Sequence, residues 1–185
     1  MSKSNKRHLA WVTLSITGFV LFALVFGFMA LDFGIHYYPQ YNPAIVESTG
    51  EIFYGYIGYS FYDLINLTLT GLLVLPFIIT FCLLLLSSVA QFALSFSSNN
   101  KYDKPRHIFR RMVIVTASIL LLLVLAIAIT TPIFVSNFNA NEDYISQYLG
   151  GGYWAMTFSL IALCVVQIVV AFMLRLKGGE NEQSN

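Results

Sequence analysis

Residues 32–63 read DFGIHYYPQYNPAIVESTGEIFYGYIGYSFYD and form a polar, aromatic segment between two long apolar runs. The segment holds seven of the eleven tyrosines, two of the five prolines, four acidic residues and no lysine or arginine. The apolar runs on either side are free of charge. This layout predicts a membrane protein that carries one aromatic, acidic loop on one side of the bilayer.

The composition of the whole chain supports this interpretation. The 185 residues are 57% apolar and only 10% charged, and the mean hydropathy is +0.72. Soluble domains average about 25% charged residues. Because so few charges cannot cover a water-exposed surface, the composition excludes an ordinary soluble domain.

Four uncharged windows, at residues 9–31, 64–100, 112–141 and 144–174, are each long enough to cross a membrane, which takes about 20 residues. We therefore predict a single all-α domain over residues 1–185, with four antiparallel transmembrane helices at about 9–31, 66–94, 112–135 and 153–174. The loops on one side, 32–65 and 136–152, are the outer loops, and 95–111 is the inner loop. The first outer loop is expected to form a small cap.

The distribution of charge predicts the orientation. Four spans place all ten basic residues on one side: Lys3, Lys6, Arg7, Lys101, Lys104, Arg106, Arg110, Arg111, Arg175 and Lys177. The opposite side carries only acidic charges, at Asp32, Glu47, Glu51, Asp63, Glu142 and Asp143. Basic residues concentrate in cytoplasmic loops, so both termini are expected in the cytoplasm.

A cleaved signal peptide is the alternative for the first span. Residues 9–31 are longer than the usual apolar region of a signal peptide, which has about 7–15 residues. Phe28 also occupies a position near Ala30 where cleavage would need a small residue. Removal would leave three spans and the same division of charge.

The spans contain few residues that could bind a cofactor, conduct ions or form a disulfide. The three histidines, His8, His36 and His107, lie outside the spans, so we expect no haem and no other cofactor. Ionisable groups inside a membrane are typical of ion pathways, and none lies in the middle of a span. The cysteines Cys82 and Cys164 both fall in apolar windows and indicate no disulfide framework.

Two features of the outer loop and two of the spans are candidate sites. Asp32 with His36, and Glu47 with Glu51, have the i,i+4 spacing at which two side chains of a helix can share a cation. Solvated loop charges are the better explanation, because the prolines and glycines of this segment disfavour a helix. The aromatic run is a candidate interaction surface or a belt at the membrane interface. Its residues are Phe53, Tyr54, Tyr56, Tyr59 and Tyr62. This run also fits either a short strand or the start of the second helix.

Within the spans, Gln167 is expected at a depth that hydroxyls on the other helices share. A buried amide in hydrocarbon needs partners, and we predict a polar layer of Gln167, Thr17, Thr80 and Ser118. A lipid-facing or partner-facing glutamine is the competing interpretation. Ala23 and Gly27 have the spacing that permits close helix contact, although ordinary packing also accounts for it.

The inner loop is expected to meet anionic lipid. Lys101, Lys104, Arg106, Arg110 and Arg111 crowd one short stretch, and each base near an anionic surface contributes about 1 kcal/mol. The topology signal alone also explains these charges. The stretch is too short to predict nucleic-acid binding.

The order and length of these segments resemble those of the claudin/PMP22-like tetraspan proteins. The shared features are a short inner N-terminus, a longer first outer loop, a brief basic inner loop and an inner tail. The resemblance implies a four-helix fold. The Trp, Gly-Leu-Trp and paired-cysteine signature of that family's first loop is absent here, so no site residue is carried over.

The function indicated by these features is non-enzymatic. We expect a scaffold, adhesion element or accessory subunit that contacts a membrane-protein partner or forms a homo-oligomer. The alternative is a small membrane enzyme or transporter component that uses the loop carboxylates and His36. Bound metal, or activity lost on substitution of Glu47 and His36, would favour that alternative.

Single cysteines in a cysteine-free background test the predicted topology. Ser4→Cys, Asn99→Cys and Ser184→Cys should be shielded from a membrane-impermeant thiol reagent in intact cells, because these positions fall on the basic side. Ser48→Cys and Asn141→Cys should react. Labelling at position 184 without labelling at position 4 would contradict four spans.

Overall fold

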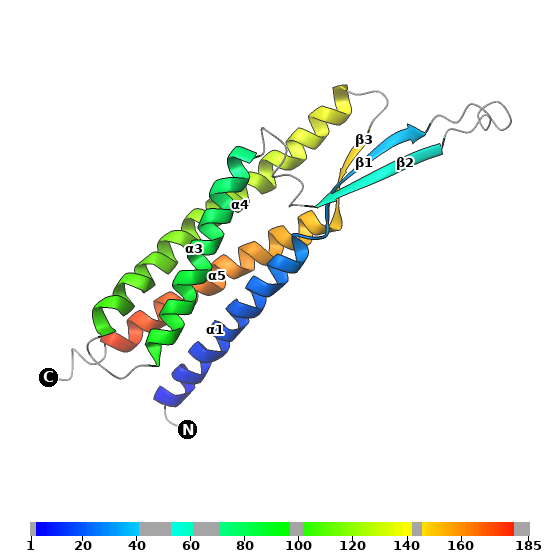
Figure 1. Cartoon of the computed structure of the whole chain (residues 1–185). Coiled ribbons are helices and arrows are strands. Elements are labelled where there is room, and N and C mark those ends of the chain that lie inside the picture. Colours follow the sequence, from blue (N-terminus) through cyan, green and yellow to red (C-terminus); the bar gives the residue numbers. More distant parts are fainter. Residues whose placement is uncertain (1–2, 41–52, 61–70, 97–101, 142–145, 180–185) are drawn as a thin grey trace, which may run out of the picture.

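Four long helices make up most of the structure, a computed structural model that describes residues 3–40, 53–60, 71–96, 102–141 and 146–179. The backbone alone is described over the first two strands. The helices are α1 (Lys3–Phe28), α3 (Gly71–Ser95), α4 (Asp103–Asn141) and α5 (Gly151–Gly179). Each contains a stretch that is long and apolar enough to cross a membrane, as predicted. Helix α1 begins and α5 ends at one end of the bundle, here named the basic end, and the strands lie at the other (Figure 1).

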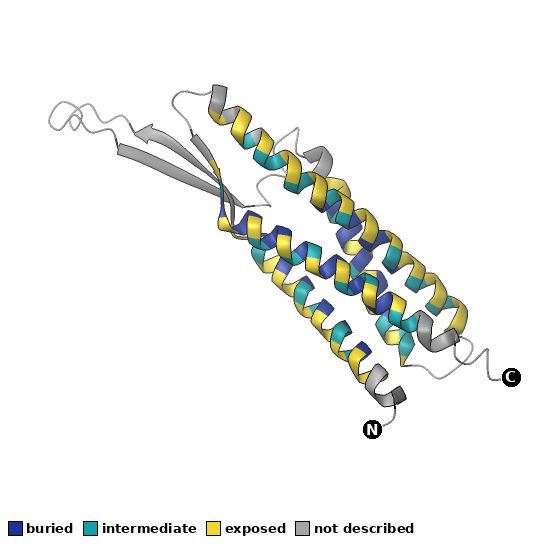
Figure 2. Cartoon of the chain, turned by 180° about the vertical axis from the view of Figure 1, so that it is seen from behind, coloured by how far each residue is buried: buried dark blue, intermediate teal, exposed yellow. Residues whose placement is uncertain are grey.

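The burial pattern is that of a protein in lipid. Only 28–39% of the residues in the apolar windows are buried inside the protein. The outward faces carry large apolar side chains, among them Leu86, Leu122, Ile129 and Phe158. Figure 2 shows buried residues along the inner faces of the helices and exposed ones outside. A soluble monomer does not tolerate an apolar surface of this extent, whereas lipid tails accommodate it.

The core of the bundle is apolar and aromatic. Its fully buried residues include Val25, Phe77, Leu84, Leu120 and Leu160, one or more from each helix. Helices α1 and α5, α3 and α4, and α4 and α5 pack directly. Aromatic rings connect α1 to α3, with Phe22 and Phe81 centred 5.3 Å apart and Phe19 and Phe92 5.4 Å apart.

Helix α4 is longer than predicted, beginning at Asp103 and ending at Asn141 rather than spanning 112–135. Its 39 residues extend about 58 Å at 1.5 Å per residue, against a hydrocarbon thickness of about 30 Å. The predicted span began after Arg111 and ended before the polar residues 136–141, but a helix continues into water as long as its backbone bonds are made. Asp103 in the first turn favours this start because a carboxylate complements the positive helix end.

Pro132 removes one backbone hydrogen bond from α4, and a side chain of α5 replaces it. A proline has no N–H to donate to the carbonyl four residues earlier, which here belongs to Ala128. The hydroxyl of Tyr153 in α5 donates to that carbonyl oxygen at 3.0 Å. No pattern in the sequence indicates this bond. Tyr153 is fully buried, whereas its neighbour Trp154 is exposed.

A three-stranded antiparallel sheet forms the cap. Its strands are β1 (Asp32–Gln40), β2 (Phe53–Ser60) and β3 (Ser146–Leu149), in the order β2-β1-β3. The first outer loop thus supplies two strands and the second supplies one. Of the two forms expected for the aromatic run, a strand is observed. Contacts of β1 with α5 and of β3 with α4 place the sheet on the helix ends (Figure 1).

Replacing Tyr153 by phenylalanine tests the repair of α4. Tyr153→Phe keeps the ring and leaves the Ala128 carbonyl without its donor, so we expect a loss of stability of about 1 kcal/mol. The measurement is thermal unfolding in detergent. In a Pro132→Ala background the backbone N–H returns, and Tyr153→Phe should then cost clearly less. Equal losses in both backgrounds would contradict the repair.

Candidate functional site: a polar cluster between α1, α3 and α5

Gln167 is the centre of a polar cluster inside the bundle. Its side chain in α5 is 3% exposed, and the hydroxyl of Ser88 in α3 donates to its Oε1 at 3.1 Å. Both partners are buried. Gln167 therefore faces into the bundle and meets a hydroxyl of another helix, Ser88, which was not among the predicted partners. Interhelical bonds of this kind contribute about 0.6 kcal/mol on average, so this bond fixes the register of α3 against α5 more than it stabilises the fold.

Gly18 allows α1 to approach the same amide. A Cβ built at Gly18 would lie 2.5 Å from Nε2 of Gln167. Real Cβ atoms essentially never come this close, so a larger residue here must displace the amide. By contrast, Gly27 and Ala23 are exposed, and a Cβ at Gly27 would meet nothing within 4 Å. The close contact of α1 therefore depends on Gly18 and not on the spaced pair noted in the sequence.

The other members of the predicted layer are not partners of Gln167. The hydroxyls of Thr17 and Thr80 donate to carbonyls of their own helices, at Thr13 (3.0 Å) and Pro76 (2.7 Å). Ser118 is exposed. Serine and threonine readily bond the carbonyl four residues earlier, so a hydroxyl in hydrocarbon needs no neighbour helix. The predicted residues were chosen because they lie at the same depth in the membrane as Gln167, but depth does not tell which helix face points toward it.

Four further polar residues surround Gln167 that the sequence analysis missed. Ser88 and Gln91 lie three residues apart in α3, and Trp11 and Ser15 lie four apart in α1, so each pair occupies one helix face. Gln91 is 3% exposed, Ser15 and Trp11 are 5% exposed. Together with Gln167 they line a small cavity. The sequence pattern that indicates them is a pair of polar residues three or four positions apart in an otherwise apolar helix.

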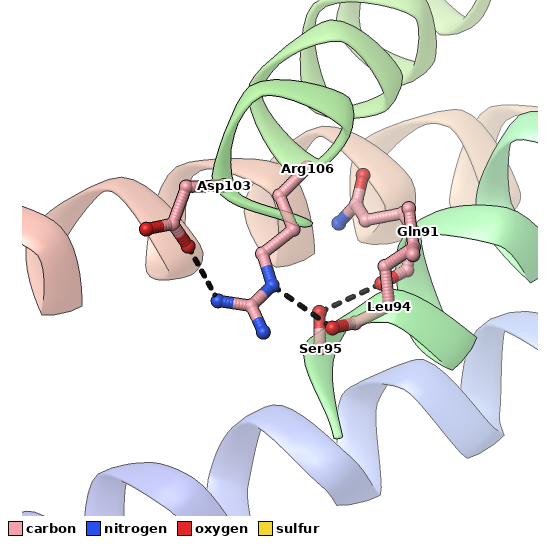
Figure 3. Close-up of polar contacts among 5 residues, drawn as sticks. All are labelled: Gln91, Leu94, Ser95, Asp103 and Arg106. Carbon is pink, nitrogen blue, oxygen red and sulfur yellow. Dashed lines mark hydrogen bonds and ion pairs between the residues drawn. The ribbon is translucent and has the colours of Figure 1, made fainter. Parts of the chain in front are cut away.

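Arg106 closes the basic end of the bundle (Figure 3). Its Nε donates to the carbonyl of Leu94 at 2.9 Å, and its Nη1 contacts Oδ1 of Asp103 at 2.8 Å. The Leu94 carbonyl belongs to the last turn of α3, where a cation complements the helix dipole. Ser95 bonds the carbonyl of Gln91 in the same turn at 2.7 Å. Arg106 thus joins α4 to the end of α3.

The remaining bases of the inner loop differ in exposure. Lys104 and Arg111 are exposed, and Arg110 is partly buried. Lys101 lies outside the described residues. Of the five bases predicted to meet anionic lipid, Arg106 is bound to Leu94 and Asp103 within the protein. Among the described bases of this loop, Lys104 and Arg111 are the most accessible to lipid.

The aromatic candidates lie in β2. Successive residues of a strand alternate between faces, so Tyr54 and Tyr56 share one face, and Phe53 and Tyr59 share the other. Tyr62 lies outside the described residues. Tyr56 pairs with Tyr37 of β1 across the sheet. The five candidates therefore do not form one surface.

The proposed cation pairs lose their geometric basis. Asp32 and His36 both lie in β1, where four residues span about 13 Å, too far for one cation. Their spacing suited a helix, and the backbone is a strand. Glu47 and Glu51 lie outside the described residues. Within the part of the chain that the structure describes, no group of three His, Cys, Asp or Glu residues could hold a metal ion.

No protein-family model, characterised protein or solved structure matches this chain. The resemblance to claudin/PMP22-like proteins therefore stays a prediction. What the structure establishes on its own is a helical bundle with four candidate membrane spans.

Two glycine substitutions in α1 form a matched test of the cluster. Gly18→Ala should displace the Gln167 amide and weaken its bond to Ser88, so its melting temperature in detergent should be lower than that of Gly27→Ala. Gly27→Ala is the control, since its new methyl group meets no atom and alanine favours a helix by about 1 kcal/mol. A melting temperature for Gly18→Ala that equals or exceeds that of Gly27→Ala would contradict the close contact.

Proposed function

We propose that the protein is a non-enzymatic membrane protein that binds another membrane protein, or a second copy of itself, through its sheet. It would act as a scaffold, adhesion element or accessory subunit. The observation that carries the proposal is the sheet beyond the helix ends (Figure 1). A helix can be anchored in lipid without a sheet beside it, so three paired strands are more than a membrane interface requires.

Strand β2 suits pairing with a partner. It is an edge of the sheet as described, and its eight residues, FYGYIGYS, contain no charge and no proline. Soluble proteins protect such edges with lysine, proline or a short strand because exposed backbone groups attract another strand. A peptide that adds a strand gains main-chain hydrogen bonds and side-chain contacts together.

One face of the sheet is rich in tyrosine. Residues directly opposite one another in a sheet share a face, so Tyr148 of β3 lies on the face of Ile35 and Gly58, and hence of Tyr54 and Tyr56. Tyr148 is 53% exposed, whereas Leu149 beside it packs against the core. The face of Tyr148 is therefore the one turned away from the helices, and tyrosine is favoured in protein interfaces.

The charge distribution supports a non-cytoplasmic position for this sheet. The basic residues that the structure describes lie at the opposite end of the bundle, which is the expected cytoplasmic end. There, Lys104 and Arg111 are available to anionic lipid headgroups. The sheet would then meet partners on the outer side or within the same membrane.

The pair Tyr54→Ser and Tyr56→Ser tests the proposal. The double variant removes two tyrosines from the strand face that β2 shares with Tyr148, so we expect at least a tenfold weaker association with a copurifying membrane protein or with itself. The measurement is the amount recovered from mild detergent and the oligomeric state by light scattering. Tyr102→Ser, an exposed tyrosine at the basic end, is the control and should retain association.

Unchanged association of the double variant, with the same melting temperature as the parent protein, would contradict a role for this face. Copurification of one partner would indicate an accessory subunit, whereas a loss of dimers alone would indicate self-association. Enzymatic activity that survives in the purified protein without a partner would contradict the non-enzymatic assignment.

A further inference from the structure

Two buried polar atoms beside Gln167 have complementary hydrogen-bonding properties. Nε1 of Trp11 is a donor and Oε1 of Gln91 is an acceptor. Both atoms are buried, and neither has a hydrogen-bond partner among the described residues. The side chains themselves are 5% and 3% exposed. Buried polar groups in proteins are almost always satisfied, so a donor and an acceptor in one place point to a shared partner.

The two side chains line the same cavity. Its other walls are Ser15, Phe19, Ser88, Phe92, Gln167 and Val170, from α1, α3 and α5. The volume is about 10 Å³, which is close to the space that one water molecule needs. The polar walls supply hydroxyls and amides, and no charged side chain is among them. The cavity therefore suits a small neutral molecule that both donates and accepts.

We propose that this cavity binds a single ordered water molecule that links α1 to α3. The water accepts a hydrogen bond from Nε1–H of Trp11 and donates one to Oε1 of Gln91. Its second hydrogen has acceptors in the hydroxyl oxygens of the cavity wall. Those hydroxyls have used their own hydrogens elsewhere, since Ser15 donates to the carbonyl of Trp11 and Ser88 donates to Gln167. Three hydrogen bonds are typical of a buried water.

A water suits this site better than other ligands. The indole N–H repels a cation, and the lack of a charged wall disfavours an anion. The rings of Phe19 and Phe92, centred 5.4 Å apart, and the ring of Trp11, 5.7 Å from Phe92, line the site. These rings pack between α1 and α3, so a bridging water adds a polar contact to an otherwise aromatic interface.

Water-to-indole magnetisation transfer in NMR tests the site directly. With tryptophan labelled by ¹⁵N in the full-length protein in nanodiscs, the indole N–H of Trp11 should show a cross-peak at the water frequency. Trp154 is exposed at the bundle surface, and Trp154→Phe leaves Trp11 as the only indole signal, which assigns it. A sharp Trp11 signal with no water cross-peak would overturn the proposal.

A double-mutant cycle gives an independent test. Trp11→Phe and Gln91→Met each remove one bond to the water and leave the other group buried, so each should lower the melting temperature by about 2–4 °C. Removing both polar groups leaves nothing unsatisfied, so the double variant should melt no lower than the less stable single variant. Additive losses would show that the two groups share no water and would overturn the proposal.

Discussion

The hydrocarbon core of a bilayer contains no water to satisfy a backbone carbonyl or amide, and this constraint governs the structure. A helix satisfies its own backbone, which is why the described residues cross the expected membrane only as helices. Pro132 removes one backbone donor from α4, and the carbonyl of Ala128 instead accepts a hydrogen bond from the Tyr153 hydroxyl at 3.0 Å. A single side chain on a neighbouring helix thus restores what the proline takes away, and it also holds α5 against α4.

The same constraint decides how polar side chains behave inside the bundle. Thr17 and Thr80 bond carbonyls of their own helices, so they place no demand on neighbours. Gln167 cannot satisfy its amide in that way, and it bonds Ser88 across the bundle. Gly18 leaves the room that the amide occupies. One glutamine therefore brings α1, α3 and α5 into a single register, although each bond contributes little energy.

The strands that the structure describes lie where water can satisfy their free edges. The sheet lies beyond the helix ends, and it joins the two outer segments of the chain into one unit. Strand β2 is one edge of this sheet as described, and it contains no charge and no proline. The bundle holds the sheet at one end, and Arg106 fixes α4 to α3 at the other.

The sequence by itself determined the four spans, their antiparallel order and the separation of basic from acidic ends. These properties are sums over local composition, since about 20 apolar residues cross a membrane in any context. It also indicated Gln167 as a candidate for a buried amide, with a lipid-facing or partner-facing glutamine as the alternative. Only the tertiary structure decided that the partner is Ser88, that Gly18 rather than Gly27 makes the close contact, and that Tyr153 bonds Ala128. The helices are apolar on nearly every face, so the sequence carries little information about their rotation. Which side chains meet is then fixed by packing between segments far apart in the chain.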